Sequence, residues 1–122
     1  MDADELKTRT KQLGLRIIKL IEALPPSKAA NVIGNQLLRS GTSIGANYRA
    51  ACRARSKPDF VSNASIAIEE ADESLYWMEL LAEAQIIPKD RLAALMKEVD
   101  EIVAILTASV KTARASMSRR AP

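Results

Sequence analysis

The stretch Ser56-Lys57-Pro58-Asp59 near the middle of the chain has the features of a helix start. Serine caps free backbone N–H groups, proline is tolerated in the first helical turn, and an acidic residue three positions after the serine makes a variant of the capping box. The stretch therefore predicts a third helix at residues 57–86, preceded by a second helix at residues 28–55.

Two other breaks divide the rest of the chain. Pro25-Pro26 ends a first helix at residues 3–24, because proline cannot continue the backbone hydrogen-bond ladder. Pro88 opens a fourth helix at residues 88–115, and residues 116–122 are predicted to be a frayed tail.

Apolar residues recur with helical spacing in each segment, so each predicted helix has one face for a core. Short connections between consecutive helices favour antiparallel neighbours. The prediction is an all-α, antiparallel up-down-up-down four-helix bundle, forming one domain over residues 1–122. The predicted core stripes are Leu6, Leu13, Ile17, Leu20 and Leu24; Ala30, Ile33, Leu37, Gly41, Ile44, Tyr48 and Ala51; Phe60, Ala64, Ala67, Ala71, Leu75, Met78 and Ala82; and Leu92, Leu95, Val99, Ile102, Leu106 and Val110.

Three glycines fall within the second predicted helix, at Gly34, Gly41 and Gly45. Each weakens a helix by roughly 1 kcal/mol relative to alanine. Either these positions let another helix approach closely, or the helix is marginal.

The composition argues for a reducing compartment and against a catalytic centre. The chain is 48% hydrophobic, with one cysteine, Cys52, and no histidine, so no internal disulfide can form. The nearest approach to a metal site is Glu69, Glu70 and Glu73, which lack the histidines of a ferritin-like centre. We expect no catalytic, metal or cofactor-binding residues. The start of the chain is not a signal peptide and no apolar run could span a bilayer, which predicts a cytoplasmic protein without a membrane partner.

The charges are unevenly distributed along the chain. Residues 28–57 contain six basic residues and no acidic one, whereas residues 59–83 contain seven acidic residues and no basic one. At about 100° per residue, Arg39, Arg49 and Arg53 fall within one sector of the second helix, opposite its apolar stripe. Two interpretations are open: the sector is a phosphate-binding surface, or it is simply a solvated helix face or a face that pairs with the acidic third helix. The candidate nucleic-acid-binding residues are Arg39, Arg49, Arg53, Arg55 and Lys57.

Further apolar residues lie away from the core stripes. In a small bundle Trp77 either fills the edge of the core or contributes to a subunit contact, where tryptophan is enriched. Apolar area beyond one stripe indicates association. The candidate oligomer-interface residues are Leu15, Ile18, Ile66, Trp77 and Leu80.

Several short patterns follow one another between about residues 6 and 106: Leu24-Pro25, Gln36-Leu37-x-Arg39-Ser40-x-x-Ser43-Ile44-x-x-Asn47, Arg55-Ser56-x-x-Asp59-Phe60, Ile66-Ala67 and Glu73-x-x-Tyr76-Trp77. Together they resemble the bacterial four-helix-bundle proteins related to those encoded in intervening sequences of large-subunit ribosomal RNA genes. That group includes the accessory variability proteins of diversity-generating retroelements. The sequence departs from many relatives at Tyr48-Arg49-Ala50, where they carry an acidic residue and glycine, and the region is more basic here.

The resemblance implies a pentameric barrel of bundles, and for the retroelement members it implies binding to nucleic acid and a reverse transcriptase. We therefore expect a non-catalytic homo-oligomer, a pentamer, with RNA or DNA and a reverse transcriptase or other protein as possible partners. The alternative is a structural self-assembling module whose charged faces pair subunits. The two hypotheses differ in whether Arg39, Arg49 and Arg53 face solvent or meet acidic residues of a neighbour. An enzyme is a third, weaker hypothesis.

Overall fold

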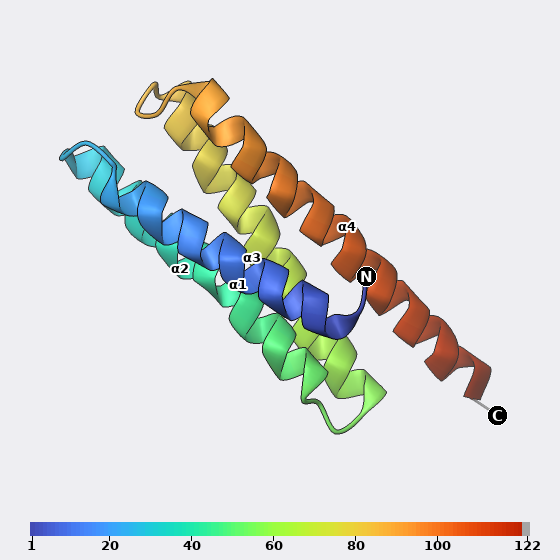
Figure 1. Cartoon of the computed structure of the whole chain (residues 1–122). Helices are drawn as coiled ribbons and strands as arrows, with labels where there is room; N and C mark the ends of the chain where they lie inside the picture. The colour runs from blue at the N-terminus through green and yellow to red at the C-terminus, as the bar shows by residue number, and fades with distance from the viewer. Residues whose placement is uncertain (121–122) are drawn as a thin grey trace.

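The computed structural model describes residues 1–120, with side chains through Arg119. Over this range the chain forms four helices and no strand (Figure 1). They are α1 (Ala3–Glu22), α2 (Lys28–Cys52), α3 (Lys57–Glu83) and α4 (Lys89–Arg120). Consecutive helices run antiparallel, which confirms the predicted all-α four-helix bundle.

Short polar side chains start the first three helices, and the serine cap predicted for the third helix is confirmed. Asp2 accepts a hydrogen bond from the backbone N–H of Glu5 at 2.8 Å, and Ser27 accepts one from Ala30 at 3.1 Å. Ser56 accepts one from Asp59 at 3.2 Å, at the start of α3. Each cap satisfies a backbone donor that has no partner within its helix.

Three helices end earlier than predicted because the chain must reverse before the next one. α1 stops at Glu22 rather than residue 24, α2 at Cys52 rather than residue 55, and α3 at Glu83 rather than residue 86. The α3 end carries a turn in which Gln85 has a φ of 59°. The N–H of Ile86 bonds back to the carbonyl of Leu81 at 2.9 Å, which is the Schellman arrangement.

The predicted tail at residues 116–122 is wrong for the part that the structure describes. α4 continues to Arg120, and residues 121–122 lie outside the described residues. The extra turn has tertiary support: Ser116 and Met117 are half-buried, and the Nζ of Lys57 at the start of α3 donates to the Ser116 hydroxyl. α4 begins at Lys89, one residue after the predicted start. Pro88 lies just before the helix, where its carbonyl accepts a hydrogen bond from the backbone N–H of Arg91.

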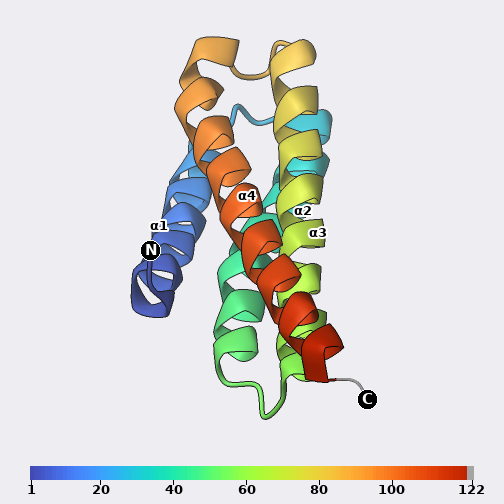
Figure 2. The same ribbon diagram turned by 90° about the vertical axis from the view of Figure 1, so that its right-hand side faces the viewer.

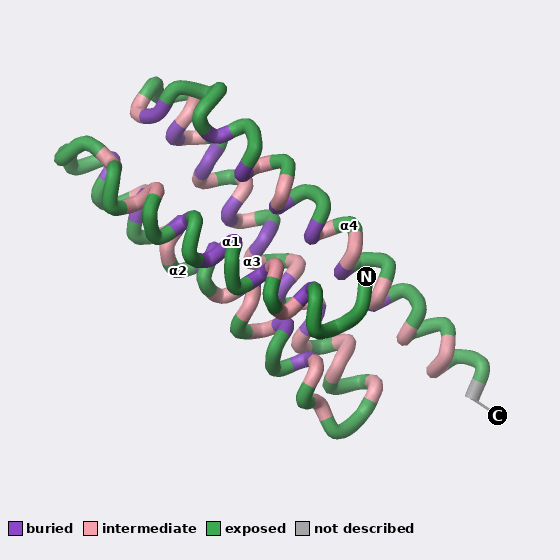
Figure 3. Tube along the Cα trace, viewed as in Figure 1, coloured by how far each residue is buried: buried purple, intermediate pink, exposed green. Residues whose placement is uncertain are grey.

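The core runs along the axis of the bundle, and its buried positions face inward from all four helices (Figure 3). All six predicted α4 positions, from Leu92 to Val110, are buried. Tyr48 is 5% exposed, which confirms its place on the core side of α2. The buried hydroxyls of Ser40 and Ser74 hydrogen-bond to each other at 2.8 Å between α2 and α3, and each is satisfied without solvent.

The helices pack as two hairpins joined through the long α2–α3 contact, while α1 meets α4 only over a short stretch (Figure 2). The guanidinium of Arg9 links α1 and α4 at this short contact. Arg9 of α1 reaches Glu98 of α4 at 2.6 and 2.7 Å and Glu101 at 2.5 Å. A bidentate pair fixes both the orientation and the separation of the two charged groups, so it holds α1 against α4.

The glycines of α2 mark its contact with α1. A Cβ at Gly41 would lie 2.3 Å from Cδ1 of Ile17, and one at Gly34 would lie 2.8 Å from Cδ1 of Leu24. A Cβ at Gly45 would meet Thr10 at 3.3 Å. Of the two readings of these glycines, close approach of a neighbouring helix is the one that the structure supports.

Candidate nucleic-acid interface

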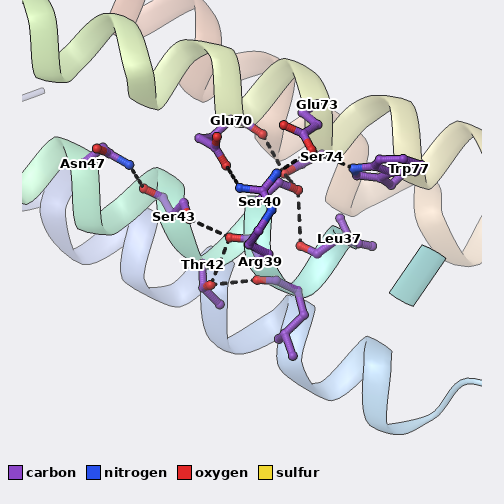
Figure 4. A network of polar contacts seen from close by, with 11 residues as sticks. Leu37, Arg39, Ser40, Thr42, Ser43, Asn47, Glu70, Glu73, Ser74 and Trp77 are labelled. Carbon is purple, nitrogen blue, oxygen red and sulfur yellow. Dashed lines mark hydrogen bonds and ion pairs between the residues drawn. The ribbon is translucent and has the colours of Figure 1, made fainter. Parts of the chain in front are cut away.

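Arg39 is paired within its own chain. Its guanidinium reaches the carboxylates of Glu70 at 2.9 Å and Glu73 at 2.5 Å on α3, and the indole N–H of Trp77 donates to Glu73 at 3.2 Å (Figure 4). The hydrogen bond from Arg39, and then that from Trp77, hold the pKa of Glu73 below its ordinary value. For Arg39 the structure therefore supports the interpretation in which the basic sector pairs with the acidic third helix, and both glutamates belong to the same chain.

Arg49 remains exposed on α2, and Arg53 and Arg55 are exposed in the connection to α3, after α2 ends at Cys52. Among the described residues, none of the three forms an ion pair or a side-chain hydrogen bond with an acid. Lys57 is half-buried at the start of α3 and donates to Ser116. The five candidate basic residues therefore divide into one paired arginine, three free arginines and one lysine engaged with α4.

The outer seam between α1 and α2 holds a groove that the helical wheel of α2 alone did not predict. Its volume is about 470 Å³, and Arg49 lines it together with two lysines of α1, Lys7 and Lys11. Its lining contains no carboxylate. Lys7 also pairs with Asp4 at 3.1 Å, an exposed contact that contributes little to stability. The signal that could have found the groove is the alignment of Lys7 and Lys11 one turn apart beside Gly14.

The structure does not bring all five candidate interface residues together. Leu15 and Ile18 are 47% and 37% exposed and line the α1–α2 groove. Ile66 is 39% exposed on α3, whereas Trp77 and Leu80 are half-buried. Trp77 packs against the core and its ring meets that of Tyr76 edge to face, with centroids 5.2 Å apart. Within this chain Trp77 fills the edge of the core.

Tyr76 is an exposed aromatic residue that the interface prediction omitted, with 52% of its surface accessible. Acidic residues surround it on the outer side of α3. These acidic residues are Glu69, Asp72, Glu79 and Glu83. Their exposed carboxylates form no ion pair with a described residue. This acidic face lies on α3, whereas the three free arginines lie on α2 and in the α2–α3 connection.

Comparison with known proteins places this geometry in a family. The sequence model of a family described as 23S rRNA-intervening sequence protein matches residues 5–108, which is most of the chain. The chain belongs to the 23S rRNA-intervening sequence protein family. The predicted family resemblance is thus confirmed. None of the curated proteins compared with the chain matches it.

A solved structure supports both the family and the fold. It is a protein of unknown function from the S23 ribosomal protein family of Bacteroides thetaiotaomicron, which is 35% identical to this chain. The match covers 91% of this chain and 99% of that one, with a TM-score of 0.85. The bundle described above is therefore shared over nearly the whole length of this family member.

Two kinds of feature are absent from the described part of the chain. No helix there is long and apolar enough to cross a bilayer. No group of three or more cysteine, aspartate or glutamate side chains there is placed to hold a metal ion. Tyr48, whose pKa burial raises, is enclosed by the core and offers no stacking surface to a base.

Proposed function

We propose that this protein is a non-catalytic, oligomeric RNA-binding adaptor that contacts phosphates through α2 and the α2–α3 connection. The observation that carries the proposal is the difference between Arg39, which two glutamates of α3 neutralise, and the three exposed arginines that have no acidic partner among the described residues. The family's name refers to ribosomal RNA, and that favours RNA over DNA as the ligand.

Symmetry would strengthen a weak site. A pentamer, which the family resemblance implies, repeats the same arginine patch in each subunit. One RNA strand that reaches several patches gains avidity without new contacts. Because the contacts go to phosphates, recognition should depend little on base sequence. A reverse transcriptase or another protein could be delivered to the RNA by the same assembly.

The test is the salt dependence of binding by a fluorescein-labelled single-stranded RNA 20-mer, with DNA of the same sequence in parallel. Replacing Arg49 and Arg53 with glutamine should weaken RNA binding. It should also reduce the slope of log affinity against log salt by about 1.4, for two phosphates at roughly 0.7 each on a single strand. The proposal fails if the wild-type protein binds neither nucleic acid at low salt.

A matched control removes the same charge from another helix. Arg91 and Lys97 are exposed on α4, which does not contact α2, so Arg91→Gln with Lys97→Gln changes the net charge equally. This double variant should keep the wild-type slope. Equal losses in both double variants would mean that overall charge, not the α2 surface, controls binding.

A second candidate function is a structural module that only assembles. The exposed acidic face of α3 favours it, because its carboxylates are left for the arginines of a neighbouring subunit. In that case Arg49→Gln with Arg53→Gln would dissociate the oligomer on a sizing column and leave any residual RNA affinity unchanged.

A further inference from the structure

The α1–α2 groove brings together cations that are far apart in the sequence. Lys7 and Lys11 come from α1 and Arg49 comes from α2, and all three line a groove of about 470 Å³. Lys7 and Lys11 are one helical turn apart, about 6 Å along the axis at 1.5 Å per residue. That separation is comparable to the spacing of successive phosphates along one nucleic-acid strand.

The floor of the groove is formed by small residues. Gly45 packs closely against Thr10, and Ala46 is exposed in the groove beside it. A Cβ at Gly14 would lie 3.9 Å from Thr42, an ordinary contact, so packing within the monomer does not require glycine there. These short side chains take up little of the groove, so a narrow ligand can approach the backbone of both helices there.

The two ends of the groove differ in chemistry. The cations gather toward the N-terminal half of α1, and Leu15 and Ile18 form an apolar edge further along the helix. A docked amphipathic helix needs a longer apolar row, with anchors at about positions i, i+4 and i+7. A single nucleic-acid strand needs cations for phosphates and a short apolar surface for a ribose or base. The groove fits the strand better.

We infer that one strand of single-stranded RNA lies in the α1–α2 groove, with Lys7 and Lys11 of α1 binding successive phosphates beside Arg49. This inference rests on the proposed function and extends it, because it adds α1 to the binding surface and gives the strand a direction along the seam. Leu15 and Ile18 then lie against the sugar or base of the nucleotide that follows the two phosphates.

The test uses the full-length chain and the labelled single-stranded RNA 20-mer. Lys7→Gln with Lys11→Gln should weaken binding and reduce the salt slope by about 1.4, for two phosphates lost. The matched control is Lys19→Gln with Lys97→Gln, two exposed lysines outside the groove lining. The control should keep the wild-type slope. Circular dichroism and light scattering should show that both double variants keep the fold and the oligomer.

A second variant tests the cavity rather than its charge. Ala46→Leu fills the channel from an exposed position and changes no charge. It should weaken RNA binding several-fold at every salt concentration and leave the thermal unfolding temperature close to that of the wild type. Normal binding by this variant would overturn the groove as the path of the strand.

The outcomes separate the groove from the broader RNA proposal. If Lys7→Gln with Lys11→Gln behaves like its control while Arg49→Gln with Arg53→Gln still weakens binding, the groove assignment is wrong and the RNA-binding function stands. If the lysine variant changes the oligomer and not the RNA affinity, the groove is a protein contact and the inference is overturned. If the wild type binds no RNA, both are wrong.

Discussion

Arg39 shows how a partner on the next helix changes the role of a charged side chain. Its sector of α2 points away from the core, which is why it groups with Arg49 and Arg53 on a helical wheel. In the folded chain it reaches across to α3 and pairs with Glu70 and Glu73. Its side chain is still half exposed, so solvent screens the pair and its contribution to stability is modest.

The titration of Glu73 tests this pairing directly. The hydrogen bond from Arg39 lowers the folded-state pKa of Glu73, so the pair stabilises the fold at neutral pH. That stability is present above the unfolded-state pKa and is lost as the pH falls through the folded-state pKa. In Arg39→Gln, the pKa of Glu73 measured by carboxyl NMR should rise toward its ordinary value.

The control for that titration is Arg53→Gln. Arg53 is exposed just after the end of the same helix and has no acidic partner among the described residues, so its loss should leave the Glu73 titration unchanged. An equal Glu73 pKa in the wild type and in Arg39→Gln would show that the ion pair does not persist in solution.

Among the helices, α1 and α2 pack closely against each other where α2 carries glycine. Ile17 of α1 occupies the space that a side chain at Gly41 of α2 would need. Ile17 is fully buried, so its side chain has little freedom to move aside. On the outer side of the same seam, Lys7 and Lys11 of α1 and Arg49 of α2 line one groove.

Gly41→Ala should therefore destabilise the protein by about 1–2 kcal/mol, because overpacking costs more than the roughly 1 kcal/mol gained in helix propensity. Gly14→Ala is the matched control, since its new Cβ has only ordinary contacts, and it should stabilise α1 by up to about 1 kcal/mol. Urea unfolding at one fixed protein concentration measures both.

Shortening the side chain of Ile17 tests whether its contact with the new Cβ causes the loss of stability. Adding Ile17→Val to Gly41→Ala removes the Cδ1 atom that lies 2.3 Å from the new Cβ, and it should recover part of the lost stability. If Gly41→Ala is as stable as Gly14→Ala, the close contact between the two helices does not limit the substitution.

As a whole, the molecule exposes apolar side chains on opposite flanks of α2. Leu15 and Ile18 lie on α1, and Ile66 and Tyr76 lie on α3. In a small bundle whose core is already filled by four stripes, exposed apolar residues on more than one helix favour contacts between subunits. Because the groove lined by Leu15 and Ile18 is assigned to RNA, Ile66 and Tyr76 on α3 are the exposed apolar residues that remain for a subunit contact.

We therefore expect a homo-oligomer, and a pentamer on the strength of the family resemblance. Light scattering on a sizing column should give a mass near five times the 13.3 kDa of one chain. Ile66→Ser with Tyr76→Ser should reduce that mass while circular dichroism remains helical. A wild-type protein that stays at 13.3 kDa at micromolar concentration would refute the oligomer.

The four helices and most of the core could be read from the sequence because their causes are local. Serine caps, Pro25-Pro26 and the spacing of apolar residues act within a few turns of one helix, and none depends on how helices are arranged. For the same reason the absence of histidine already argued against metal and acid–base chemistry before any fold was known.

The tertiary structure alone decided which charges meet, because that depends on the register between helices. On a helical wheel of α2, Arg39 and Arg49 fall in one sector, but α3 approaches one flank of the helix and α1 the other. Arg39 is therefore paired with glutamates of α3, and Arg49 lies beside Lys7 and Lys11 of α1. The end of α4 was misjudged for a related reason. Nothing local to Ser116 predicts that it packs against Lys57, a residue that reaches it only when α3 and α4 lie antiparallel.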